Sequence, residues 1–99
     1  EITITKPSPF QGAKVANISP ALADELHLDP GTEGVVVTAL VDDGMAASVG
    51  FMKGDIILAV NNKKIARTAD LERAVNEAGR LWRITLIRGG QQIQVMLGG

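Results

Sequence analysis

The sequence predicts an α+β fold in which helices close the ends of a small antiparallel sheet. The apolar, largely β-branched run Ile56–Val60 lies between turn signals and is typical of a strand buried on both faces, although periodicity alone leaves a buried helix open. Two alternating runs, residues 82–88 and 91–97, flank Gly89-Gly90, which is the pattern of a β-hairpin. Residues 69–78 repeat apolar side chains at helical spacing. We expect the other elements to wrap around the strand at residues 56–60.

The N-terminal part of the chain predicts two strands. Residues 1–5 (EITIT) alternate polar and apolar residues, which indicates a half-buried strand that Pro7 and Pro9 end. Residues 13–18 (AKVANI) alternate again and predict a second strand.

A short helix and a further strand should follow. Ser19-Pro20 favours a helix start, because Ser caps free amides and Pro is tolerated at the first helical position. This helix should extend through His27 and stop at Asp29-Pro30-Gly31. Residues 35–40 (VVVTAL) read as a buried strand, which Asp42-Asp43-Gly44 ends.

The segments around the central strand are short. Residues 45–49 predict a short helix with Gly50 as its left-handed stop. After the central strand, Asn61-Asn62 predicts a tight turn, since Asn tolerates positive φ, and residues 63–65 should be extended.

The longest helix is expected at residues 69–78, capped by Thr68 and ended by Gly79. Its apolar face, formed by Leu71, Ala74, Val75 and Ala78, is expected to pack on the core. Such a face at the edge of a helix can also form the wall of a groove.

Composition excludes several classes of function. The 99 residues suffice for one domain with a core, and their 45% hydrophobic and 21% charged content is that of a globular protein without a membrane-inserted segment. A formal charge of −1 and three aromatic residues do not favour nucleic-acid binding. The sequence has no cysteine, so it has no disulfide, thiolate nucleophile or cysteine-based metal site. Because the sequence opens on Glu1 without an apolar signal core, we interpret it as a single domain excised from a larger protein.

Few residues suggest catalysis or cofactor binding. His27, which is the single histidine, lies in the last turn of a predicted helix and is expected to interact with the helix dipole rather than to act in catalysis. Asp42-Asp43-Gly44 lacks the further oxygen ligands of a calcium loop, so we expect a turn and no metal site. The arginines alternate with acidic residues, which favours a solvated surface of mixed charge. We therefore expect no catalytic residue and no cofactor.

The loop before the second strand is the one candidate for ligand binding. Pro9-Phe10-Gln11-Gly12 places a glycine beside an aromatic residue, directly before the strand, which would let a ligand approach the backbone amides. An ordinary connecting loop remains the alternative.

Residues 50–62 (GFMKGDIILAVNN) carry a resemblance to a known family. An apolar residue followed by Lys-Gly-Asp and an apolar strand ending in Val-Asn resembles the signature of PDZ domains. The helix TADLERAVNEAG and the hairpin LWRITLIRGGQQIQV resemble the closing elements of that family. The order of the elements is similar to the permuted PDZ domains of bacterial HtrA (Do-like, DegP/DegQ-type) serine proteases, and PFQGAKVANISPALADEL is most similar to the second, C-terminal one.

The resemblance implies a small antiparallel barrel or sandwich of five to six strands closed by two helices. It also implies peptide binding by strand addition along residues 13–17, with a terminal carboxylate meeting the amides of the loop at residues 10–13. The implied peptide-binding residues come from the loop, the second strand and the long helix: Phe10, Gln11, Gly12, Ala13, Lys14, Val15, Thr68, Leu71, Glu72 and Val75.

The implied partners are unfolded or C-terminal segments of protein substrates, together with an attached protease domain and a first PDZ domain. The family resemblance further implies a periplasmic location and a homo-oligomer formed through the parent protein. An alternative is a structural docking domain with a closed or inactive groove, which would assemble protease subunits.

Overall fold

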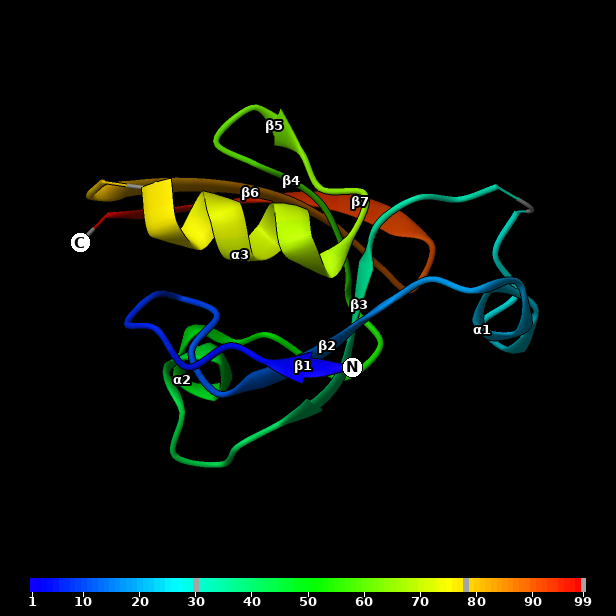
Figure 1. Cartoon of the computed structure of the whole chain (residues 1–99), viewed down its shortest axis with the longest axis horizontal. Coiled ribbons are helices and arrows are strands. Elements are labelled where there is room, and N and C mark those ends of the chain that lie inside the picture. Colours follow the sequence, from blue (N-terminus) through cyan, green and yellow to red (C-terminus); the bar gives the residue numbers. More distant parts are fainter. Residues whose placement is uncertain (30, 78, 99) are drawn as a thin grey trace.

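The computed structural model describes residues 1–29, 31–77 and 79–98, within which it has seven strands and three helices (Figure 1). The strands are β1 (Ile2–Thr3), β2 (Ala13–Asn17), β3 (Val35–Leu40), β4 (Ile56–Val60), β5 (Lys63–Lys64), β6 (Leu81–Arg88) and β7 (Gln91–Gly98). The helices are α1 (Pro20–Glu25), α2 (Met45–Val49) and α3 (Thr68–Glu77). The expected turn residue Pro30 and the expected helix end Ala78 lie outside the described residues.

Strand β4 is the centre of an antiparallel sheet with the order β1-β2-β3-β4-β6-β7. It pairs with β3 along one side and with β6 along the other, while β5 pairs with its last residues. Ile56 and Ile57 point to opposite faces of the sheet, and both are buried. The prediction of a central strand buried on both faces is therefore confirmed for this part of β4, and the alternative of a buried helix is excluded.

The predicted turns follow from residues that tolerate positive φ. Gly50 ends α2 with φ of 107°, as expected for a left-handed helix stop. Asn61 and Asn62 have φ of 52° and 68°, and Gly89 and Gly90 have φ of 58° and 79°. Two consecutive positive φ values are what a primed hairpin turn requires, so both tight turns are confirmed.

The fold class is confirmed, with differences in detail. The sheet is open rather than closed into a barrel, and the described residues contain one more helix and at least one more strand than the resemblance implied. Helix α1 ends earlier than expected, because His27 adopts φ of 58° and cannot continue it. Helix α3 begins at Thr68 itself, so Thr68 is its first residue rather than its cap.

An aromatic cluster fills the core beside α2 and β6. The ring of Phe10 stacks on Phe51 with centroids 5.0 Å apart and meets the edge of Trp82 at 6.1 Å. Such pairs prefer offset or edge-to-face geometry, as these do. The loop before β2 is thus anchored to the core by an aromatic side chain.

A buried ion pair joins the turn before β4 to the end of β6. Asp55 is 1% exposed, and its two carboxylate oxygens accept hydrogen bonds from Arg88 at 2.9 and 2.7 Å. The same carboxylate accepts from the backbone N–H of Met52 at 2.8 Å. The Asp55 carboxylate raises the pKa of Arg88 above its already high ordinary value. The Asp of the Lys-Gly-Asp motif therefore has a structural role, which sequence reasoning did not assign.

Candidate functional site

Strand β2 and helix α3 form the two walls of a groove. At one end the walls are linked, because the side-chain oxygen of Asn17 accepts a hydrogen bond from the backbone N–H of Thr68 at 2.7 Å. Val15 on β2 and Leu71 and Val75 on α3 are buried in the same apolar cluster. This arrangement brings together the two walls that the sequence predicted to form a binding site.

The N-terminal strand β1 lies in this groove. It pairs antiparallel with β2, with Ile2 opposite Val15 and Thr3 opposite Lys14. Ile4 continues the pairing: its N–H donates to the carbonyl of Ala13 at 2.9 Å, and its carbonyl accepts from the N–H of Gly12 at 2.8 Å. The Ile4 side chain is 4% exposed and belongs to the apolar cluster.

Helix α3 flanks this occupying segment on its other side. Residues 3–6 share a hollow of about 180 Å³ with Glu72, Val75 and Asn76 of α3. Figure 1 shows β1 (blue) running beside α3 (yellow). An extended segment of the chain itself therefore occupies the groove.

The backbone N–H groups of the loop at residues 10–13 do not point together at a vacant position where a carboxylate could bind. The N–H of Phe10 donates to the Ser8 hydroxyl at 3.2 Å, and the N–H of Gln11 donates to the Ser8 carbonyl at 3.1 Å. The N–H of Ala13 donates to the carbonyl of Phe10 at 2.9 Å. Together with the bond from Gly12 to Ile4, all four amides have partners within the chain.

The backbone freedom of Gly12 serves a contact inside the protein. Gly12 has φ of 89°, and a Cβ atom there would lie 3.0 Å from the Cα atom of Gly44. The carbonyls of Gln11 and Gly12 accept hydrogen bonds from Ala46 and Val41, each at 2.9 Å. The glycine that suggested close approach of a ligand thus permits close approach of the loop before α2.

The other expected site residues divide between the core and the two rims. Phe10, Ala13, Val15, Leu71 and Val75 have buried side chains, whereas Lys14 and Glu72 are exposed on opposite walls. The side chain of Gln11 reaches the groove segment, since its Nε2 donates to the carbonyl of Thr5 at 3.4 Å. Val15, Leu71 and Val75 therefore meet in the apolar cluster between the two walls, whereas Phe10 packs against Phe51 and Trp82.

Sequence reasoning missed Ile2 and Ile4 at this site, and it gave the side chain of Asn17, at the end of the expected binding strand, no role. A signal for the first two was present, because two alternating strands joined by a short Pro-rich and Gly-containing turn commonly pair as neighbours. The position of Asn17 at the end of the alternating run gave no comparable signal.

The first turn of α3 is held by Asp70. Its carboxylate accepts hydrogen bonds from the N–H groups of Ala66 at 3.0 Å and Arg67 at 3.1 Å. These two backbone bonds, the one from Ala66 first, lower the pKa of Asp70 below its ordinary value. A hydrogen bond from Lys63 lowers the pKa of Glu77 near the other end of the helix. Both contacts fix the helix that forms one wall of the groove.

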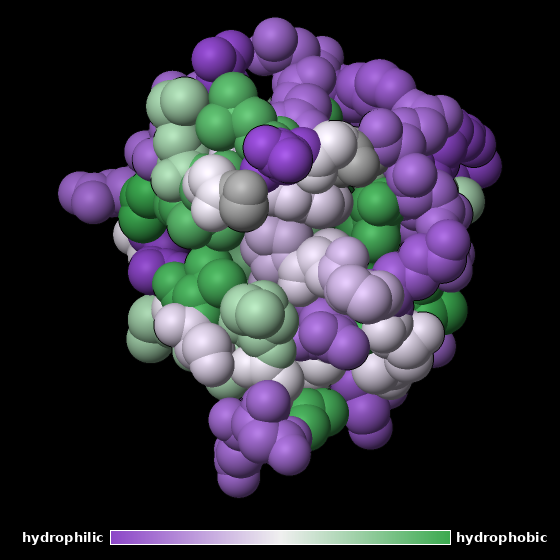
Figure 2. All heavy atoms as spheres, turned by 90° about the vertical axis from the view of Figure 1, so that its left-hand side faces the viewer, coloured by the Kyte–Doolittle hydropathy of each residue, from purple (hydrophilic) through white to green (hydrophobic). Residues whose placement is uncertain are grey.

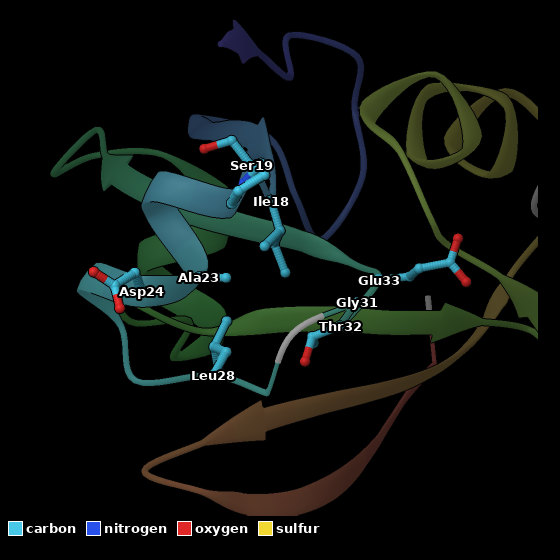
Figure 3. A pocket seen from close by; sticks show the side chains of 9 residues that line it. Ile18, Ser19, Ala23, Asp24, Leu28, Gly31, Thr32 and Glu33 are labelled. Atoms are coloured by element: carbon cyan, nitrogen blue, oxygen red, sulfur yellow. The ribbon is translucent and has the colours of Figure 1, made fainter.

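A larger hollow lies elsewhere, beneath α1. It measures about 520 Å³ and is lined by apolar side chains, including Ile18, Ala23 and Leu28, and by polar ones. Figure 3 shows Asp24 and Glu33 at opposite ends of this hollow, so their carboxylates do not converge on a common point.

An apolar depression lies at the end of the molecule where β7 finishes. It measures about 320 Å³ and is lined partly by Met45, Val49, Trp82 and Leu97. Figure 2 shows this end of the molecule, where apolar groups (green) are interrupted by polar ones (purple).

Residues 1–29, 31–77 and 79–98 contain neither a metal-binding cluster nor a membrane-spanning helix. No group of three or more His, Cys, Asp or Glu side chains is arranged to hold a metal ion in that part of the chain. None of its helices has both the length and the apolar character needed to cross a lipid bilayer.

Comparison with known families identifies the fold. A family model described as PDZ domain matches residues 4–97. The chain is a member of the PDZ domain family. This PDZ domain is 30% identical over 83 residues to a probable periplasmic serine endoprotease, DegP-like, of Chlamydia pneumoniae, with 84% of this chain and 17% of the relative covered. A protein of the same description from Pseudomonas putida is 33% identical over 91 residues, with 88% and 19% covered.

Solved structures agree with this assignment. The HtrA-type protease AlgW with a decapeptide shares 29% identity with this chain at a TM-score of 0.73, covering 88% of this chain and 27% of that one. The HtrA3 PDZ domain bound to the phage-derived ligand FGRWV, at 24% identity and a TM-score of 0.73, supports the fold alone. The PDZ domain described here thus spans less than a fifth of the two DegP-like relatives.

Proposed function

We propose that this chain is a non-catalytic PDZ module of an HtrA-type serine protease that binds extended segments of protein substrates by strand addition to β2. The observation that carries the proposal is Ile4, which lies in the groove with both of its backbone groups paired and its side chain buried. The groove thus has the geometry to accept an extended chain with an apolar anchor. Main-chain bonds would give affinity, and the pocket would give selectivity.

The relatives support the wider setting of this proposal. The two DegP-like relatives are named periplasmic serine endoproteases, and the AlgW structure contains a decapeptide. We place the parent protein in the periplasm, where the domain would present substrate segments to an attached protease domain beside a first PDZ domain. In this arrangement the domain regulates cleavage without taking part in the chemistry.

A titration followed by NMR tests the proposal. A hexapeptide of alternating isoleucine and threonine with blocked ends is added to the wild type and to Ile4→Asn, in which the anchor of β1 is removed. We expect amide shifts at residues 12–15 and 71–75. A peptide with serine in place of isoleucine is the control. The proposal fails if neither protein shows these shifts at about 1 mM peptide, which corresponds to a binding free energy of roughly −4 kcal/mol.

A second candidate function is supported by the occupied groove. Because β1 covers the edge of β2, the domain could act as a docking element that holds protease subunits in a homo-oligomer. Deleting the domain from the parent protein should then reduce the oligomer size in light scattering while leaving cleavage per active site unchanged. An unchanged oligomer would exclude this role.

A further inference from the structure

The segment at residues 1–5 makes the contacts of a bound strand rather than those of a loose terminus. Ile2 and Ile4 lie on the same side of β1, while Thr3 between them is exposed and pairs with Lys14. Ile2 is half-buried against the core, and Ile4 is buried within it. The positions that the groove contacts most closely are therefore two apolar residues separated by one outward-facing residue.

The chain does not end at the pocket that holds Ile4. It continues through Thr5, whose carbonyl accepts a hydrogen bond from the Gln11 side chain, and then past the loop that carries Ser8. A hollow of about 340 Å³ opens on this side of the segment, between residues 3–5 and the loop before α2. The geometry at this end accommodates a strand that passes through the site.

A free carboxylate would find little to bind at the same place. The amides of Phe10, Gln11 and Ala13 donate to groups of their own loop, so the Gly12 amide is the one that release of β1 would free. The side chain of Asp43 lines the adjoining hollow together with Gln11 and Gly12. The Asp43 carboxylate would repel the negative charge of a peptide C-terminus placed beside it.

We propose that residues 1–5 are a built-in ligand of the groove, and that the groove takes internal protein segments with two apolar residues one residue apart rather than free C-termini. This inference rests on the proposed function. A competing segment must displace β1, which is tethered and therefore acts at a high effective concentration. The apparent affinity for a free peptide is reduced by the fraction of molecules in which the groove is open.

Binding to blocked and unblocked peptides tests the inference. The peptides are acetyl-EITITK-amide, acetyl-EITI-amide and acetyl-EITI with a free carboxylate, and the proteins are the wild type, Ile4→Asn and Ile93→Asn. Ile93 packs on the core from β7, away from the groove, so its variant controls for general loss of stability.

We expect Ile4→Asn to bind acetyl-EITITK-amide about tenfold or more tightly than the wild type does. The substitution weakens the docking of β1, which competes with the peptide for the groove. Ile93→Asn should bind as the wild type does, and the free acid should bind no more tightly than its amide. If Ile4→Asn prefers the free acid by about tenfold, or binds no better than the wild type, the inference fails while the proposed function stands. If no peptide binds any of the proteins, both fail.

A measurement on the wild type keeps the inference testable if Ile4→Asn does not fold. Saturating acetyl-EITITK-amide should abolish the hydrogen-exchange protection of the Ile4 amide, since that amide donates to Ala13 only while β1 is in place. Retained protection in the peptide-bound state would show that the peptide binds elsewhere and would overturn the inference.

Discussion

Strands β4 and β1 both bury isoleucine side chains, yet they differ in how many partners hold them. β4 pairs along both sides, with β3 and with β6, and its Ile57 is fully buried. β1 pairs along one side, with β2, and lies at an end of the sheet order. A strand held on one side can detach while the rest of the sheet stays intact. Burial of a side chain therefore does not by itself measure how far the fold depends on it.

The largest effect is expected at the centre of the sheet. Replacing Ile57 by Ala should lower the free energy of unfolding by about 2–5 kcal/mol. The smaller side chain leaves a cavity, and the paired strands around it cannot move independently to fill that space. Chemical denaturation of the two proteins measures this difference. A loss below about 1 kcal/mol would show that β4 is not the element on which the core depends.

The ion pair beside β4 should come next. Asp55→Asn removes the charge that Arg88 contacts and weakens the acceptor for Met52, and hydrogen bonds to charged groups contribute about 1.5–3 kcal/mol. The difference should appear in the same denaturation experiment. Asp42→Asn, at an exposed position in a turn, serves as the control and should stay within about 0.5 kcal/mol of the wild type. An equal loss of unfolding free energy in Asp55→Asn and Asp42→Asn would contradict a structural role for the buried ion pair.

The sequence predicts the centre of the fold better than it predicts the site. The strand Ile56–Val60 and the two tight turns depend on β-branched content and on residues that accept positive φ, which are properties of short stretches. The contact between Gly12 and Gly44 depends on a close approach between distant parts of the chain. No spacing within the sequence reports such an approach.

The groove shows the same division between local and distant information. The strand signal at residues 1–5 is visible, but its placement against β2 and α3, with Ile4 in the pocket, requires the three-dimensional arrangement. The buried carboxylate of Asp55 was likewise not assigned, because its partner Arg88 lies on another strand. The sequence thus places several expected site residues on the two walls of this groove, while the segment that occupies it was missed.

A third substitution compares β1 directly with β4. Ile4→Ala should lower the free energy of unfolding by about 1–2 kcal/mol, less than Ile57→Ala, because detachment of β1 limits the loss to the free energy of docking that strand. Chemical denaturation again measures the difference, and hydrogen exchange at the Ile4 amide should accelerate. A loss equal to that of Ile57→Ala would show that β1 is an integral part of the core, which would weaken its assignment as a displaceable ligand.

The smallest effect concerns the helix that forms the second wall. The backbone bonds from Ala66 and Arg67 lower the pKa of Asp70 in the folded protein, so the ionised carboxylate stabilises the fold above the ordinary Asp pKa of about 4. This contribution is lost as the pH falls through the lowered folded pKa. Asp70→Asn should therefore be less stable than the wild type at pH 7 and should lose less stability between about pH 5 and about pH 2.

Denaturation midpoints measured across this range test the sign of the effect. Glu72→Gln is the matched control, because Glu72 is exposed on the same helix and makes no side-chain hydrogen bond among the described residues. Asp70→Asn should converge toward the wild type as the pH falls, since both side chains are then uncharged. A difference that stays constant down to about pH 2 would mean that Asp70 stabilises α3 by geometry rather than through its charge.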